Sequence, residues 1–206
     1  MPELPEVETV ARQLAPLLIG RRILAFEVFD PLLRIDHPRR AAGRAIARVE
    51  RLGKQILLGL DAGAQAQSPL WLCIHLRMTG RLLWSDAPAD RRRPDAPAPL
   101  RARWRLDQGS LLFHDTRRLG TIRLLANLEE ARPEGLDPTA QGFTPRDLAA
   151  LLAGSRQRIK PWLLRQDRLV GVGNIYASEA LFEAGIHPAR SADSLRPAQA
   201  HRLWEA

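Results

Sequence analysis

The sequence predicts an α+β fold in which an N-terminal helix and an antiparallel β-sandwich precede an all-helical domain. Three observations support this prediction. Residues 7–18 have apolar side chains at helical spacing, residues 22–125 carry short apolar runs, and strand patterns cease before residue 145. We expect domains at residues 1–131 and 145–206, joined by a linker at 132–144 where Pro, Gly and Thr cluster.

The first helix is predicted over residues 7–18. Gly20 follows this segment and is a typical stop signal. The apolar residues that share one helical face are Val7, Val10, Ala11, Leu14, Leu17 and Leu18.

The strands of the sandwich are predicted from apolar runs separated by Gly, Asp and Pro. Cys73 lies within one of these runs, and we interpret it as a core residue rather than a reactive one. Residues 86–99 are rich in Pro, Ala, Asp and Arg, and they predict a long mobile loop. The predicted strands are residues 23–28, 56–60, 70–76, 82–84, 104–106, 111–114 and 121–125.

The helical domain is predicted from periodic patterns at residues 145–153, 159–165 and 175–184. A fourth helix is expected to start near Ser194 and to run into the chain end. Because this pattern reaches Ala206 without a capping residue, we expect the chain to be incomplete.

The charge balance favours a polyanionic partner. The 206 residues carry a formal net charge of +8, which suits nucleic acid. Only Lys54 and Lys160 among the 31 basic residues are lysines, which suggests that these two positions need a compact, deprotonatable amine. The alternative is that two lysines are present there by chance. No apolar run approaches the roughly 20 residues of a membrane span, and the amino terminus lacks a signal-peptide pattern. We expect a cytoplasmic protein with no membrane partner.

Pro2 is a candidate nucleophile. Once Met1 is removed, its nitrogen is a terminal secondary amine with a pKa of roughly 8, so a neutral fraction exists near neutral pH. Such an amine can attack a sugar aldehyde carbon and form an iminium. Glu3 and Glu6 stand beside it and are suited to moving protons. The alternative is an ordinary helix start with acidic residues in the first turn.

A second candidate site surrounds Lys160 and the following Gly171-Val172-Gly173-Asn174 segment. Two predicted helices meet at this glycine-bearing turn, so the amino end of the second helix is suited to binding a phosphate. Asn174 can cap that helix or bond a phosphate oxygen. Gly-x-Gly segments are often only turns, and the basic charge adds weight to the DNA interpretation.

Met78, Arg117 and Leu119 form a third candidate set. Apolar wedges and a cation near strand ends can fill the gap that a flipped-out base leaves in a duplex. Met and Leu near strands are usually core residues, so this pattern is weak by itself.

These segments together resemble the bacterial formamidopyrimidine-DNA glycosylases over the whole chain. Five motifs carry the resemblance in matching order and at matching separations. They are residues 2–9 (PELPEVET), 51–54 (RLGK), 75–80 (HLRMTG), 115–120 (DTRRLG) and the stretch 160–184.

The resemblance implies a base-excision repair enzyme with a helix-two-turn-helix domain, acting on duplex DNA that carries 8-oxoguanine, formamidopyrimidines or abasic sites. Pro2 would attack C1′ of the damaged nucleotide, Glu3 would serve as general acid and base, and Glu6 would support that geometry. Lys54 would assist strand cleavage by β-elimination.

The DNA-binding residues follow from the same resemblance. Met78, Arg117 and Leu119 would fill the void in the duplex, with Arg117 facing the orphaned cytosine. Lys160, Gly173 and Asn174 would hold the phosphates. We expect the protein to act as a monomer.

Several positions depart from the family pattern. Leu119 replaces a usual Phe, which keeps apolar bulk but loses aromatic stacking, so we expect weaker lesion interrogation with retained chemistry. Thr116 replaces a common Pro. Pro99 stands about where a DNA-contacting His is usual, which leaves Arg101 as the nearest substitute.

The family's four-cysteine zinc finger is missing from these residues, and with it the arginine assigned to δ-elimination. We therefore expect no metal and no cofactor in this chain, because one cysteine cannot form a four-thiolate site. Two alternatives remain open: a non-catalytic protein that binds damaged or abasic DNA, and a helical RNA-binding module.

Overall fold

A computed structural model describes residues 2–62, 68–86 and 99–206. The chain divides into two compact units, Met1–Arg132 and Pro133–Ala206, and the buried apolar clusters fall within one unit or the other. Most of the loop predicted at 86–99 lies outside the described residues. None of the described helices is long and apolar enough to span a membrane.

Helix α1 (Leu4–Leu18) opens the first unit and begins three residues earlier than predicted. The early start has a local cause: the backbone N–H of Glu3 donates to the Glu6 carboxylate at 2.9 Å, which closes the first turn. Pro5 is tolerated there because the first turn needs no amide donor. Most of the predicted apolar stripe is buried, including Val7, Leu14 and Leu18, but Leu17 is exposed.

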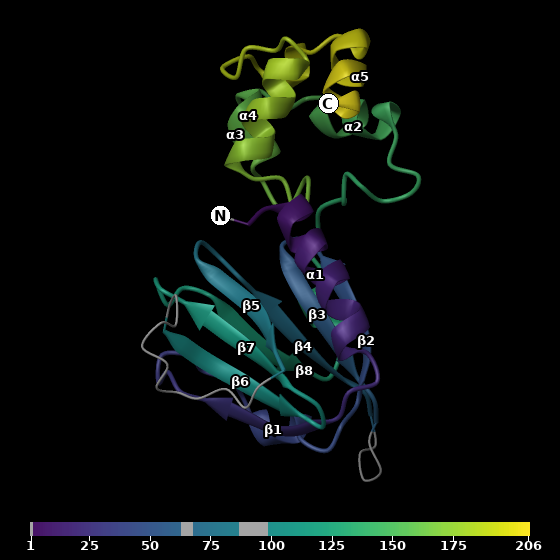
Figure 1. The fold of residues 1–206 in the computed structure, drawn as a ribbon. Coiled ribbons are helices and arrows are strands. Elements are labelled where there is room, and N and C mark those ends of the chain that lie inside the picture. The colour runs from purple at the N-terminus through teal and green to yellow at the C-terminus, as the bar shows by residue number, and fades with distance from the viewer. Residues whose placement is uncertain (1, 63–67, 87–98) are drawn as a thin grey trace. The chain divides into compact units, whose positions relative to one another are not determined.

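Two four-stranded antiparallel sheets form the sandwich (Figure 1). One has the order β1 (Ile23–Val28), β6 (Leu100–Leu106), β7 (Ser110–Asp115) and β5 (Gly80–Ser85). The other has the order β2 (Ile46–Leu52), β3 (Gln55–Leu60), β4 (Leu70–His75) and β8 (Thr121–Leu125). Helix α1 packs against β2 and β3. The predicted helix and antiparallel sandwich are confirmed.

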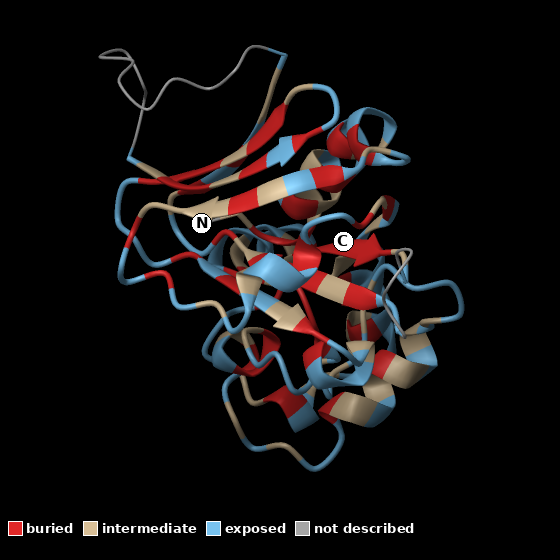
Figure 2. Cartoon of the chain, turned by 90° about the horizontal axis from the view of Figure 1, so that it is seen from below, coloured by how far each residue is buried: buried red, intermediate tan, exposed pale blue. Residues whose placement is uncertain are grey.

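Strand β2 was not predicted. It is an edge strand, and among its seven residues only Ile46 is fully buried, so its sequence lacks the apolar run that marks β3 and β4. Figure 2 colours each residue by its burial, and strands such as β3 are buried along almost their whole length. An edge strand with one buried residue falls below what apolar patterning detects.

The sandwich core joins side chains from both sheets and α1. Within it Phe26 of β1 stacks on Trp104 of β6 with ring centroids 4.6 Å apart. A smaller apolar cluster forms between β3, β4 and the short helix η2 (Leu128–Ala131), and it contains Cys73, which is 1% exposed. Burial raises the pKa of the Cys73 thiol to about 11, which confirms a core role. Another short helix, η1 (Pro38–Ala41), follows β1.

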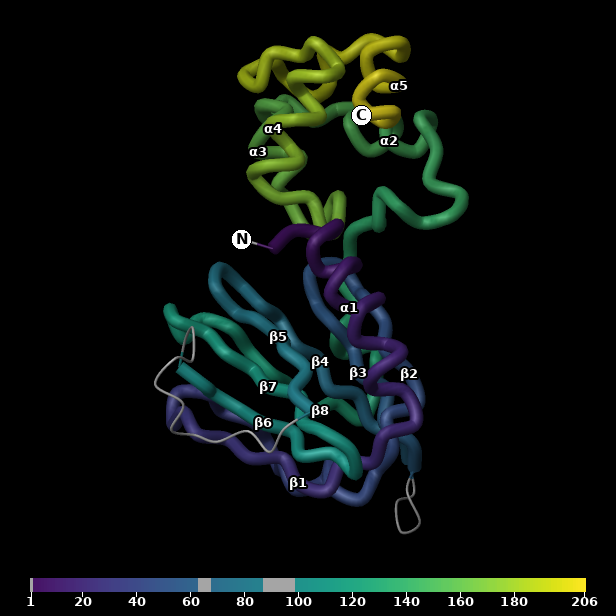
Figure 3. Tube along the Cα trace, in the orientation of Figure 1, coloured from purple at the N-terminus to yellow at the C-terminus, as the bar shows by residue number. Residues whose placement is uncertain are grey.

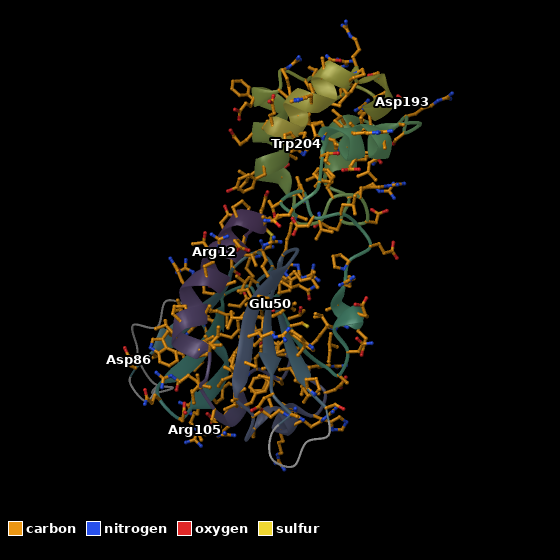
Figure 4. All side chains as sticks on the ribbon, turned by 90° about the vertical axis from the view of Figure 1, so that its right-hand side faces the viewer. Arg12, Glu50, Asp86, Arg105, Asp193 and Trp204 are labelled. Carbon is orange, nitrogen blue, oxygen red and sulfur yellow. The ribbon has the colours of Figure 1, made fainter. Side chains whose placement is uncertain are left out.

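The second unit contains α2 (Pro145–Leu152), α3 (Ile159–Leu163), α4 (Asn174–Glu183), the short helix η3 (Ala192–Ser194) and α5 (Pro197–Glu205) (Figure 3). Its core surrounds Trp162. Trp204 of α5, labelled in Figure 4, donates from Nε1 to the Phe143 carbonyl at 3.0 Å. The fourth predicted helix starts later than expected because Pro197 fixes the first turn of α5 and disfavours helix at the residue before it.

Candidate functional site

A cavity of about 610 Å³ in the first unit contains the predicted nucleophile. Pro2 and Glu6 line it at the start of α1, and Met78, Thr79 and Thr116 line it from two loops of the sandwich. The folded unit therefore gathers residues from three separate motifs around one space. It is the candidate site for a ligand that Pro2 could attack.

Glu3 and Lys54 lie close enough to interact electrostatically at this end of the sandwich. Glu3 is 1% exposed, and Lys54 occupies the tight turn between β2 and β3, where Gly53 has a φ of 58°. Burial lowers the pKa of the Lys54 amine, while the negative charge of Glu3 opposes that shift. A lysine whose amine is more easily deprotonated than usual is suited to proton transfer.

His75 lies beside the same lysine at the end of β4. Its Nδ1 accepts a hydrogen bond from the Arg77 backbone at 3.0 Å. Burial, followed by the charges of Arg77 and Lys54, lowers the pKa of His75 to about 4. The imidazole is therefore neutral at neutral pH and adds no charge to the site.

Two loops present the three residues that were predicted to fill a void in DNA. Met78 and Leu119 are 41% and 46% exposed, although their side chains are large and apolar, and Arg117 is also exposed. The loops meet through Thr79, whose hydroxyl accepts from the Arg117 backbone at 3.1 Å. The structure thus brings the three residues onto adjacent loops with their side chains accessible.

In the second unit, the turn between α3 and α4 is held by the side chain of Gln166. Its amide donates to the Leu164 and Val172 carbonyls at 3.0 and 2.9 Å, and its carbonyl accepts from Gly171 at 3.0 Å. Gly171 has a φ of 93°, which only glycine adopts at low cost. Gly173 is the N-cap of α4, and the exposed Asn174 is its first residue.

Lys160 lies on α3 and reaches α4. Its Nζ donates to the Ser178 hydroxyl at 2.9 Å, and that hydroxyl donates to the Asn174 carbonyl at 2.7 Å. A short chain of hydrogen bonds therefore links the predicted phosphate ligands Lys160 and Asn174. Of the three predicted phosphate ligands, Asn174 is exposed, Lys160 is half-buried and Gly173 is buried.

The sequence matches two parts of one protein family. Residues 1–122 match the formamidopyrimidine-DNA glycosylase N-terminal domain, and residues 135–206 match the H2TH domain of the same enzymes. The chain belongs to the formamidopyrimidine-DNA glycosylase family. The two matches correspond to the two units of the fold.

Curated relatives agree with this assignment. A formamidopyrimidine-DNA glycosylase from Symbiobacterium thermophilum is 43% identical over 98% of this chain, and one from Moorella thermoacetica is 41% identical over 98% of it. The chain spans 66% of the first relative's length and 74% of the second's.

Solved structures of the family have the same fold. The Fpg (MutM) protein of Thermus thermophilus has a TM-score of 0.82 and 36% identity, with 99% of this chain and 72% of that one covered. A Lactococcus lactis Fpg variant bound to DNA containing Fapy-dG has a TM-score of 0.85 and 29% identity, with 99% and 74% covered.

The structure contradicts the prediction that Arg101 contacts DNA. Arg101 is 1% exposed, and its guanidinium bonds Asp30 at 2.6 Å and the Gly120 carbonyl at 2.7 Å. The pairing of β6 with β7 shifts register between Leu100 and Ala102, and Arg101 lies at this irregularity, buried like its neighbour Ala102. There it neutralises a buried carboxylate. Arg101 was chosen because it is near Pro99 in the sequence, and that nearness does not show whether its side chain is buried or exposed.

The family's zinc site does not fit the residues of this chain. Its single cysteine, Cys73, is buried, and its raised pKa keeps the thiol protonated and a poor metal ligand. The described residues contain no group of three His, Cys, Asp or Glu side chains that could hold a metal ion.

Thr79 and Asp115 are the residues that sequence reasoning missed. Both belong to the motifs named above but received no role. Asp115 is completely buried at the end of β7 and bonds the Thr79 hydroxyl at 2.5 Å. A carboxylate directly after the apolar run 111–114 was the available signal, because a buried carboxylate at a strand end requires partners.

Proposed function

We propose that this chain is a DNA glycosylase with abasic-site lyase activity that excises oxidised purines from duplex DNA, using the Pro2 nitrogen as nucleophile. The cavity that joins Pro2 and Glu6 to Met78, Thr79 and Thr116 is the observation that carries this proposal. It places an amine beside the loops suited to replacing an extruded base.

The chemistry follows from the groups present. The Pro2 lone pair forms a bond to C1′ of the damaged nucleotide, the bond from C1′ to the base breaks, and the departing base takes its electron pair and a proton. The sugar ring then opens to an iminium. Removal of a C2′ proton breaks the C3′–O bond and cleaves the strand, and water hydrolyses the iminium to restore Pro2.

Glu3 and Lys54 supply the proton transfers in this proposal. Glu3 is buried at the first turn of α1, one residue from Pro2. The lowered pKa of Lys54 makes it a better acid at neutral pH than an ordinary lysine. Glu6 acts indirectly, because its carboxylate holds the Glu3 backbone.

The partner in this proposal is duplex DNA with oxidised purines or abasic sites, bound by a monomer. The family membership supports it, as do the DNA complexes of related proteins, among them Lactococcus lactis Fpg with Fapy-dG and with an abasic site. The exposed Asn174, which follows the buried N-cap Gly173, and the half-buried Lys160 provide donors for phosphate oxygens.

Borohydride trapping tests the nucleophile. We expect the chain with a free Pro2 to form a covalent adduct with a duplex containing 8-oxoguanine or an abasic site, because borohydride reduces the iminium to a stable amine. A matched chain that keeps an amino-terminal extension before Pro2 should form none. Glu3→Gln should slow adduct formation on the 8-oxoguanine duplex.

The alternatives give different results. Tight binding to damaged duplex without any adduct would contradict the enzyme proposal and support a non-catalytic damage-binding protein. Equal affinity for RNA and for damaged duplex, with no adduct, would support an RNA-binding module. Sedimentation equilibrium checks the monomer.

A further inference from the structure

The loops that carry Met78, Arg117 and Leu119 both cross between the two sheets at one end of the sandwich. Residues 76–79 lead from β4 to β5, and residues 116–120 lead from β7 to β8. Neither loop belongs to a sheet, so other contacts must fix their separation.

Asp115 is the centre of the polar contacts between these loops. One carboxylate oxygen accepts from the Thr79 hydroxyl at 2.5 Å and from the Arg117 backbone at 3.2 Å. The other accepts from the Gly120 backbone at 2.6 Å and lies 3.3 Å from the Arg101 guanidinium. Both oxygens of a fully buried carboxylate are therefore satisfied by loop residues and one cation.

Charge in this region is balanced by two arginines and two carboxylates. Asp30 accepts from Arg101 at 2.6 Å and also pairs with Arg118, which lies between the two exposed loop residues Arg117 and Leu119. The Arg118 hydrogen bond, opposed by burial, holds the pKa of Asp30 well below its usual range. The second loop is therefore tied to the sandwich on both sides.

The loop backbones need such support because each contains a non-glycine residue in the left-handed region. Arg77 has a φ of 54° and Arg118 a φ of 56°. Residues with a Cβ adopt this conformation only when their surroundings stabilise it.

Thr79 is the only side chain in the first loop that bonds the second, among the described residues. Its hydroxyl donates a hydrogen bond to Asp115 and accepts one from the Arg117 backbone, so the same oxygen acts as donor and acceptor between the two loops. Removing that oxygen while keeping the shape of the side chain would separate the loops without opening the core.

We propose that Thr79 and Asp115 are positioning residues that hold the two loops in one fixed arrangement, so that Met78, Arg117 and Leu119 enter the duplex together. This inference rests on the proposed function. Excision requires the damaged base to leave the stack, and the wedge must then occupy its place. Cleavage at a preformed abasic site requires less of the wedge, because no base remains to be displaced.

The test compares Thr79→Val with Thr79→Ser, which keeps the hydroxyl. In single-turnover reactions, we expect Thr79→Val to slow 8-oxoguanine excision about tenfold, as expected for the loss of a bridging hydrogen bond. Cleavage of a preformed abasic site should fall by about twofold or less. Thr79→Ser should restore excision to within about twofold of the natural chain.

Thr121→Val is the matched control. Thr121 is exposed on β8, and its hydroxyl makes no hydrogen bond among the described residues, so this variant should leave both rates unchanged. Equal losses of excision and abasic cleavage in Thr79→Val would overturn the proposal in favour of a general stability effect. Unchanged excision would overturn it too.

Amide hydrogen exchange in the free protein separates this inference from the proposed function. We expect Thr79→Val to accelerate exchange of the Arg117 and Gly120 amide hydrogens by about threefold or more. In Thr121→Val the exchange rates of the same two amides should be unchanged. Unaltered exchange would overturn the locking role, whether or not the chain excises any base. A natural chain that neither excises nor forms an adduct would instead refute the proposed function.

Discussion

Pro2 and Glu3 owe their positions to the first turn of α1 rather than to a catalytic loop. The Glu6 carboxylate accepts from the Glu3 backbone at 2.9 Å, and Leu4 is buried beneath the turn. This hydrogen bond and the buried Leu4 are also what an ordinary helix start would show, and they hold Pro2 at the edge of the cavity. The two interpretations of this segment are compatible.

His75 gives the protein a defined sensitivity to acid. Its folded pKa of about 4 lies below the usual 6.5, so the neutral form is favoured in the native state. This stabilisation is present above pH 6.5 and is lost as the pH falls through the window from 6.5 to 4. When the pH falls from 7.5 to 5, the unfolding free energy of the natural chain should therefore decrease by about 1 to 2 kcal/mol, after allowance for the partial exposure of His75.

The variant His75→Asn should remove this dependence, because its side chain is neutral at every pH and still offers an acceptor to the Arg77 backbone. Urea unfolding at pH 7.5 and at pH 5 measures the effect. We expect the stability advantage of the natural chain over the variant to shrink by that amount at pH 5. An advantage independent of pH would show that the imidazole titrates normally.

The site residues show what sequence reasoning can and cannot locate. Lys54 was singled out because lysine is rare in this chain, and burial near Glu3 gives that choice a physical basis. Arg101 was assigned wrongly because its burial depends on an irregularity in the pairing of β6 with β7, which the sequence pattern does not show. Thr79 and Asp115 act through a contact between positions 36 residues apart, which no local pattern reveals.

At the scale of elements, the helix and strand patterns were predicted well where one face is buried. Helix α1 buries five residues at helical spacing, and β3 buries five of its six. Strand β2 escaped detection because an edge strand has little to bury. The later start of α5 depends on Pro197, a signal that was present and was not used.

Gly80 sets the geometry where the first loop enters β5. A Cβ at this position would lie 2.4 Å from the Leu76 carbonyl oxygen, which is backbone and cannot rotate away. We therefore expect Gly80→Ala to lower the unfolding free energy by about 3 kcal/mol, because the turn must shift. Thermal or urea unfolding measures this change.

Gly43→Ala is the control for that variant. Gly43 lies in the same unit with a φ of 82° and has nothing within 4 Å of a Cβ, so alanine there should cost only the left-handed strain of about 1 kcal/mol. A Gly80→Ala loss no larger than that of Gly43→Ala would mean that the loop relaxes without cost.

At the scale of the whole molecule, the residues proposed for catalysis and those proposed for phosphate binding lie in different units with different cores. Pro2, Glu3 and Lys54 belong to Met1–Arg132, while Lys160 and Asn174 belong to Pro133–Ala206. The net charge of +8 acts over both. Separate cores allow the binding surface and the chemistry to be tested independently.

Salt dependence distinguishes charged from neutral phosphate ligands. Each phosphate neutralised by a cation releases counterions and contributes about −0.9 to the slope of log affinity against log salt concentration. Lys160→Gln should therefore reduce the magnitude of that slope by about 1 and weaken binding to all duplexes alike. Asn174→Ala should weaken binding with the slope unchanged, because an amide releases no counterion.

Arg105→Gln is the control, because Arg105 pairs with Ser110 at the start of β7, the end of that strand away from residues 116–120, and its side chain is 54% exposed (Figure 4). It should change neither the affinity nor the slope. Fluorescence anisotropy between about 50 and 200 mM salt measures both, because about six to ten phosphate contacts would weaken binding by about 10³-fold or more over this range. An unchanged slope in Lys160→Gln would show that the lysine serves only its bond to Ser178. In that case the helix terminus and Asn174 would hold the phosphate without a cation, and binding would depend on salt only through charges elsewhere in the chain.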